Sequence, residues 1–189
     1  MAVFPLFISL DELPCLVVGG GKVALRKVKT LLEYGAKVTV IAPQTESEID
    51  EMNGVEIRKR EFREKDLQGM RIVFVATSNP ECNRYVAALC REKKILVNVA
   101  DVPEECDFFF PALVRRKDVV VGISTGGKSP AAARKIREEL DRQLPGSVGD
   151  FVEEVGELRT KLKECGQKAE GNAEYMERIT AYFGGQEYK

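Results

Sequence analysis

The sequence predicts an α/β protein with a parallel sheet, followed by a β-hairpin and a small C-terminal helical domain. Short apolar runs alternate with helical patterns over the first half of the chain and recur at roughly 20-residue intervals, as in βαβ units. No strand-like run occurs beyond residue 129, and the 189 residues exceed the ~150 of a typical domain. We therefore expect a main domain over 1–112, a hairpin and helix connector over 113–145, and a helical domain over 146–189.

Five strands are expected in the parallel sheet. Cys15–Val18 is a short apolar run that ends directly before three glycines, which is typical of a buried strand. A helix is expected from Lys22 to Tyr34, where apolar residues recur at helical spacing and Gly35 provides a stop signal. The other four strands are expected at Lys37–Ile41, Val55–Ile57, Ile72–Ala76 and from Ile95 onward. A second helix is expected over 80–92.

The pattern changes after residue 101. Phe108–Val114 and Val119–Ile123 are strand-like and are separated by a charged stretch over 115–118, which predicts a hairpin outside the parallel sheet. Ser129 followed by Pro130 is a typical helix start, and Pro145-Gly146 interrupts the helical pattern. Helices are therefore expected from 130 to about 144, along the apolar stripe of 148–162, and over 173–183.

Charge and composition exclude several classes of function. The 29 Lys and Arg balance 30 Asp and Glu, which argues against a nucleic-acid-binding surface. No run approaches the ~18 apolar residues that span a bilayer, and the N-terminus lacks the pattern of a signal peptide, so we expect a cytoplasmic protein. The five Cys form no C-x-x-C pair, and the absence of His removes His-based metal sites and Ser-His-Asp triads. No metal site is predicted.

A glycine-rich turn follows the first expected strand. Gly19–Ala24 fits the pattern G-x-G-x-x-A in the context of strand, turn and helix that a dinucleotide-binding motif requires. Gly19 permits the tight turn, Gly21 lets the backbone approach a pyrophosphate, and the free N–H groups of Lys22 and Val23 would bind it. The pattern favours a Rossmann-like nucleotide-binding domain, and the alternative is a glycine-rich turn without a ligand.

Two further strand ends are candidate cofactor contacts. The strand at Lys37–Ile41 ends without the usual acid for the ribose, so Pro43 and Gln44 are the candidate contacts there. This strand also ends without an Arg for a 2′-phosphate, which favours NAD over NADP. Thr77 and Asn79, after the strand at Ile72–Ala76, are expected to border the nicotinamide; the alternative is simple helix capping ahead of Pro80.

A second loop, Gly122–Ser129, fits G-x-x-x-x-G-K-[ST], the phosphate loop of many NTPases. Read literally, it predicts a nucleotide-hydrolysing protein. Such folds continue with further parallel strands, whereas no strand-like run follows this loop, so we interpret it as an anion-binding loop. Its residues Ser124, Thr125, Gly126 and Lys128, at a helix start, would suit a substrate carboxylate.

With these motifs in place, the chain resembles the precorrin-2 dehydrogenase family, which includes the N-terminal module of siroheme synthase. Four passages carry the resemblance, and they cover nearly the whole chain in order: Leu16–Lys27, Val97–Asp101, Phe110–Val114 and Ile123–Ala131. The resemblance implies NAD-dependent oxidation of precorrin-2 to sirohydrochlorin in siroheme biosynthesis. It also implies a homodimer formed through the hairpin and helical region, and iron or cobalt insertion by some members.

The resemblance aligns Asp101 with the essential aspartate of the family. Asp101 follows the fifth expected strand, at the sheet edge where α/β proteins place their active sites, and a carboxylate is a plausible proton acceptor in a chain without His. The alternative is a turn-forming aspartate before Pro103. Two other functions remain open at this point, namely a metal chelatase in which Asp101 takes pyrrole protons, and a non-catalytic nucleotide sensor.

Overall fold

The computed structural model describes residues 3–184, which divide into two compact units. The first unit is Phe4–Phe110, and the second begins at Pro111 and includes Val3.

The first unit is built on a five-stranded parallel sheet in the order β3-β2-β1-β4-β5. This architecture confirms the α/β fold that the sequence predicts. Each strand begins within one residue of its expected start, because apolar and β-branched runs bounded by turn residues leave little ambiguity. The strands are β1 (Pro14–Val18), β2 (Lys37–Ile41), β3 (Val55–Arg58), β4 (Ile72–Val75) and β5 (Leu96–Val99).

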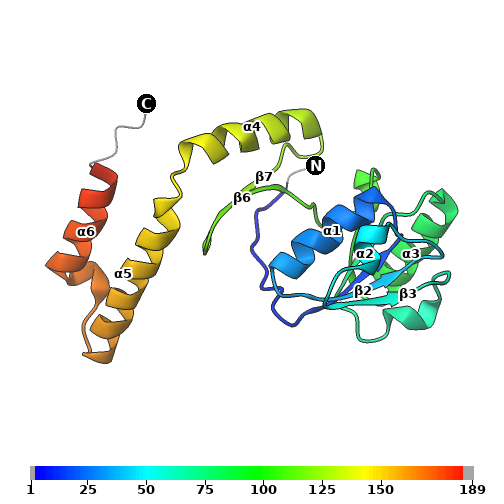
Figure 1. Cartoon of the computed structure of the whole chain (residues 1–189), viewed down its shortest axis with the longest axis horizontal. Coiled ribbons are helices and arrows are strands. Elements are labelled where there is room, and N and C mark those ends of the chain that lie inside the picture. Colours follow the sequence, from blue (N-terminus) through cyan, green and yellow to red (C-terminus); the bar gives the residue numbers. More distant parts are fainter. Residues whose placement is uncertain (1–2, 185–189) are drawn as a thin grey trace. The chain divides into compact units, whose positions relative to one another are not determined.

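Two apolar cores lie on opposite faces of this sheet, each beneath one of the two long helices that flank it (Figure 1). Successive residues of a strand point to opposite faces, so Cys15 and Val17 pack with helix α1 (Lys22–Glu33) while Leu16 and Val18 pack with helix α3 (Pro80–Glu92). The sequence predicted both helices. It did not predict the short segments, which are too brief to show a periodicity: α2 (Ser47–Asp50), η1 (Glu64–Leu67) and η2 (Pro103–Glu105).

The second unit consists of an antiparallel hairpin and three helices. The strand β6 (Ala112–Arg116) pairs with β7 (Val119–Ile123), and helix α4 packs its Ala133 against Val114 and Ile123 of the hairpin. Ser129 caps α4 by accepting a hydrogen bond from the backbone of Ala132, as the sequence predicts. The helical elements are α4 (Pro130–Gln143), α5 (Ser147–Glu164), η3 (Ala169–Gly171) and α6 (Ala173–Gly184).

The expected bounds of the hairpin are wrong on one side. The first strand begins at Ala112 and not at Phe108, and the turn contains only Lys117 and Asp118, since Arg116 already pairs with Val119. Phe108 is held elsewhere, because its ring packs edge-on against Phe74 of the sheet at a centroid distance of 5.4 Å. Tertiary packing therefore overrides the strand propensity of these aromatic residues.

No helix within residues 3–184 has both the length and the apolar character needed to cross a bilayer.

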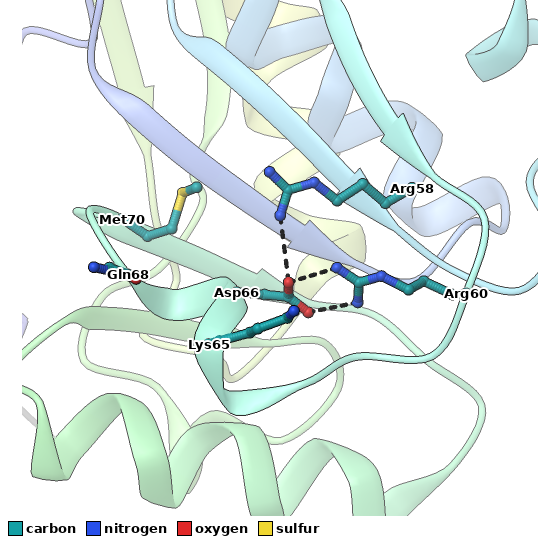
Figure 2. A pocket seen from close by; sticks show the side chains of 6 residues that line it. All are labelled: Arg58, Arg60, Lys65, Asp66, Gln68 and Met70. Carbon is teal, nitrogen blue, oxygen red and sulfur yellow. Dashed lines mark hydrogen bonds and ion pairs between the residues drawn. The ribbon is translucent and has the colours of Figure 1, made fainter.

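A buried carboxylate connects the edge of the sheet to η1 (Figure 2). The Asp66 side chain is only 1% exposed and accepts two hydrogen bonds from the Arg60 guanidinium, at 2.6 and 2.7 Å. Arg58 at the end of β3 and the backbone N–H of Arg63 also donate to it. These donors, with Arg60 first among them, lower the pKa of Asp66 to about 2 even though burial opposes ionisation. Together with Lys65, Gln68 and Met70 the three side chains line a cavity of about 350 Å³.

We expect Asp66→Asn to lower the free energy of unfolding at pH 7 by about 2 kcal/mol, because the folded state holds the pKa well below its unfolded value. A depressed carboxyl pKa adds stability above about pH 4, and that stability is lost as the pH falls toward 2. Denaturant titrations from pH 7 to pH 2 should therefore show the two proteins converging in acid. Glu64→Gln on the same segment is the control, and a constant difference across the pH range would contradict the assignment.

Candidate functional site

The carboxyl ends of four adjacent strands lie side by side in the first unit and carry most of the predicted site residues. The chain reverses its direction of growth across the sheet between β1 and β4, and ligands of open α/β sheets bind in the crevice at this position. Backbone hydrogen bonds fix the loops to one another: Gly19 donates to Ile41 at 2.9 Å, Ala76 to Val18 at 2.8 Å and Ala100 to Val75 at 2.8 Å.

The glycine turn after β1 has the geometry of a dinucleotide loop. Gly19 has a φ of +123°, and a Cβ at this position would lie 2.3 Å from the carbonyl oxygen of Ala76. A Cβ on Gly20 would lie 2.1 Å from the carbonyl oxygen of Gln44, so this glycine, which the motif leaves unspecified, is also needed for close packing. Ala24 is fully buried against the sheet, as the motif requires.

Gly21 has a different environment. It is the N-cap of α1. Among residues 3–184, no side chain caps this helix and a Cβ on Gly21 would meet no atom within 4 Å. The N–H groups of Lys22 and Val23 donate to no residue of the described range 3–184, and they lie at the positive end of a twelve-residue helix. This arrangement fits a pyrophosphate, which would accept these hydrogen bonds where a capping side chain otherwise would.

The predicted contacts after β2 and β4 border this turn. Pro43 and Gln44 are exposed, and the segment that contains them is joined to the glycine turn by a hydrogen bond from Glu46 N–H to Gly20 C=O of 2.8 Å. The side chains after β4 are used within the loop itself. Asn79 caps α3 by accepting hydrogen bonds from the backbone of Glu81 and Cys82, and the Thr77 hydroxyl donates to Asn83. Thr77 and Asn79 both lie between β4 and α3, and Asn79 is exposed.

Asp101 lies two residues beyond β5 and is exposed. Its φ of +60° is a left-handed conformation that aspartate tolerates better than most residues. Its carboxylate makes no hydrogen bond or ion pair with any residue in the described range 3–184, so it does not serve as a side-chain cap for the turn. Asp107, which is close in sequence, has a structural role instead, because it accepts a hydrogen bond from the backbone of Val97.

Sequence reasoning did not identify Lys27 and Asn98, which meet beneath these loops. The Lys27 ammonium donates a 2.8 Å hydrogen bond to Asn98 of β5 and lies 5.1 and 4.9 Å from the ring centroids of Phe74 and Phe110. Burial lowers the pKa of Lys27 to about 8. A signal existed in the sequence, since Lys27 lies one turn after Val23 and one turn before Leu31 and thus on the apolar stripe of α1.

The predicted anion loop belongs to the second unit. It joins β7 to α4, and Gly126 and Gly127 adopt φ values of +61° and +78°. Thr125 and Ser124 stabilise the loop internally, since Thr125 bonds to the backbone of Ser129 and Ser124 accepts from the N–H of Gly126. Lys128 is exposed and is not seen to bond with another residue of the part of the chain described here.

The strand before this loop separates it from the NTPase class. In phosphate-loop folds the preceding strand belongs to the parallel sheet, whereas β7 pairs with β6 in an antiparallel hairpin. Within residues 3–184, no three acidic or Cys side chains gather in a way that could hold a metal ion.

The chain is similar to known protein families and to curated proteins over nearly its whole length. Residues 6–112 match the family described as "Putative NAD(P)-binding", and residues 121–143 match the family "Sirohaem biosynthesis protein central". The chain is 38% identical over 181 residues to a siroheme synthase of Methylococcus capsulatus and 37% identical over 182 residues to one of Thioalkalivibrio sulfidiphilus. These alignments cover 94% and 95% of this chain but only 38% and 37% of the relatives.

A solved structure is similar over most of both chains. It is described as SirC, precorrin-2 dehydrogenase, and superimposes with a TM-score of 0.69 at 30% sequence identity. The match covers 84% of this chain and 79% of that one.

We expect substitution of Gly19 to reduce stability and substitution of Gly21 to reduce cofactor binding. Gly19→Ala should destabilise the fold by about 3 kcal/mol or more, because it adds a Cβ at a positive φ and against a backbone carbonyl. Gly21→Asp should retain the stability of the wild type, since its Cβ has free space and Asp is a favourable N-cap, yet it should abolish NAD binding by charge repulsion. Denaturant unfolding and calorimetric titration with NAD measure the two effects. A folded Gly21→Asp protein with the wild-type affinity for NAD would contradict the site assignment.

Proposed function

The chain belongs to the precorrin-2 dehydrogenase and siroheme synthase family, and on this basis we propose that it oxidises precorrin-2 to sirohydrochlorin with NAD. The observation that carries the proposal is that an uncapped helix N-terminus and an unbonded carboxylate lie at the same edge of the sheet, after β1 and β5 respectively. The first suits the pyrophosphate of a dinucleotide, and the second suits a proton acceptor for an oxidation.

The cofactor, when bound, supplies the hydride acceptor. The residues that would hold it follow from the geometry of the site. Gly19 and Gly21 would lie along the pyrophosphate, with the N–H groups of Lys22 and Val23 donating to it. Two further pairs would border its outer parts: Pro43 with Gln44 on the adenosine side, and Thr77 with Asn79 on the nicotinamide side.

NAD is proposed over NADP because the segment directly after β2 carries no cationic side chain. The end of β2 carries Ala42, Pro43 and Gln44. In the register of the sheet Arg58 lies opposite Ile41, and its guanidinium bonds to Glu56 and Asp66.

Asp101 is proposed to accept the proton that the oxidation releases. Removing a hydride and a proton from precorrin-2 leaves the more conjugated sirohydrochlorin, so the chain must supply a base as well as orient the substrate. Asp101 has a carboxylate that bonds to no residue within 3–184, and it is exposed just after β5, the neighbour of β4, whose following loop is proposed to border the nicotinamide. An aspartate that only formed the turn would be expected to bond to neighbouring backbone groups.

The second unit is proposed to contribute to substrate binding and assembly. Ser124, Thr125, Gly126 and Lys128 form a glycine-containing loop at the start of the fourteen-residue helix α4, which suits a carboxylate of the tetrapyrrole. Family membership supports a homodimer that uses the hairpin and the helical segment.

We also propose that the chain divides at 112 and 145 into a nucleotide-binding domain, a connector and a helical domain.

A metal chelatase on the same fold is the competing function, because an unbonded Asp101 would also suit the removal of pyrrole protons. Anaerobic absorbance spectra separate the two functions. We expect the purified chain with precorrin-2 and NAD to form sirohydrochlorin and NADH. Metal insertion into sirohydrochlorin on addition of Co²⁺ or Fe²⁺, without NADH formation in the first assay, would favour the chelatase. Binding of NAD with neither reaction would favour a nucleotide sensor.

We expect Asp101→Asn to reduce the rate of NADH formation by about 10²- to 10⁴-fold, the usual contribution of a general base, with little change in NAD affinity. Asparagine keeps the size of the side chain and also tolerates the left-handed backbone, so the fold should be retained. Glu104→Gln, an exposed acid three residues away, is the matched variant. Wild-type turnover by Asp101→Asn at saturating NAD, or an equal loss in Glu104→Gln, would remove Asp101 from the role.

We expect Lys128→Ala to raise the KM for precorrin-2 several-fold while leaving the Kd for NAD unchanged, because the loss of one exposed charge contact weakens substrate binding only. Lys135→Ala, an exposed lysine on α4 that pairs with Glu138, is the control. Steady-state kinetics and calorimetry measure the two constants. Micromolar ATP binding by the wild type that disappears in Lys128→Ala would instead support the phosphate-loop interpretation.

A further inference from the structure

The ammonium group of Lys27 is enclosed in the apolar core between α1 and the sheet. The residue is 9% exposed, and its ammonium lies over two aromatic rings, those of Phe74 and Phe110. Its hydrogen-bond partner is the neutral Oδ1 of Asn98 at 2.8 Å, and it forms no ion pair with a carboxylate in residues 3–184. Every other buried side chain of α1 is apolar: Ala24, Leu25, Val28 and Leu31.

Such a charge is costly to retain. Desolvation is the main cause of its lowered pKa of about 8; Arg26 acts in the same direction, while Cys106 and Asp101 oppose it. Two cation–π contacts and one hydrogen bond offset only part of the desolvation free energy of a buried ammonium group. An apolar side chain of similar length would fill the same space without this desolvation penalty, so stability alone does not account for a lysine here.

Asn98 connects this lysine to the loop that carries Asp101. Its side-chain N–H₂ donates to the carbonyl oxygen of Phe108 at 2.9 Å and approaches the sulfur of Cys106 at 3.5 Å. Cys106 in turn bonds to both backbone groups of Val99, the last residue of β5. The segment from Ala100 to Asp107 is thereby closed back onto β5, and Asp101 lies within it.

We infer that Lys27 is a positioning residue for Asp101. Through its hydrogen bond to Asn98, Lys27 connects the helix that would bind the pyrophosphate to the loop that would provide the base. The inference rests on the proposed function. Lys27 lies six residues beyond Gly21, the N-cap of the same helix, and its bond to Asn98 spans 71 residues of sequence. Lys27 therefore couples the positions of the two halves of the proposed reaction without contacting the substrate.

A double-mutant cycle in the full-length chain tests this role. Lys27→Met keeps an unbranched apolar stem between the two rings and removes the charge and the bond to Asn98. We expect kcat to fall by about 10- to 100-fold, as for a base displaced by a fraction of an ångström to an ångström, with the KM for precorrin-2 and the Kd for NAD little changed. In the Asp101→Asn background the same substitution should reduce kcat by less than about threefold, because residues that act as a unit are not additive.

Lys29→Met is the matched control, since Lys29 is exposed on the same helix and pairs with Glu48. Asn98→Ala cuts the same link from the β5 side and replaces Lys27→Met if that protein does not fold. Equal losses of kcat in the wild-type and Asp101→Asn backgrounds would mean a general structural role and would overturn the inference, as would a Lys27→Met protein with the wild-type kcat. A wild-type chain that forms no NADH would overturn the proposed function and the inference together.

Discussion

The central position of β1, paired with β2 on one side and β4 on the other, is the constraint on which the nucleotide-binding unit depends. Because the chain continues outward from β1 in both directions, the loops after β1 and β4 diverge and leave the start of α1 uncovered. The same pairing brings the backbone of Gly19 against the carbonyl of Ala76, which no residue with a side chain could accommodate. The strand order of the sheet thus requires a glycine at the end of β1.

Both faces of this sheet are buried, so a polar side chain in its core loses contact with water. Alternate strand residues pack against α1 on one face and α3 on the other, and nearly all of them are apolar. Lys27 and Asn98 are exceptions that satisfy each other at 2.8 Å between α1 and β5. Their cost in desolvation is consistent with the proposed chemistry at the edge above them, where the relative positions of a helix terminus and a carboxylate matter more than the stability of the core.

The second unit is organised by a different packing rule. Its hairpin is too small to be stable alone and is covered by α4 and α5, with Gly149 of α5 packed so closely on the hairpin that a Cβ would lie 2.7 Å from the carbonyl oxygen of Arg116. The loop from Ser124 to Ser129 is held by its own hydroxyl groups, so its exposed lysine and glycines are presented on an ordered backbone. This order is what the proposed binding of a carboxylate requires.

The sequence by itself determined the parallel sheet, its flanking helices, the glycine turn and the placement of Asp101 after β5. These features depend on local patterns, namely apolar runs, helical spacing and turn residues, which are readable without knowing what lies nearby. Tertiary structure alone decided that Phe108 and Phe110 pack on Phe74 instead of extending the hairpin. It also decided that Lys27 of α1 meets Asn98 of β5. Such outcomes depend on which distant side chains share a space, and sequence spacing carries no record of contacts 71 residues apart.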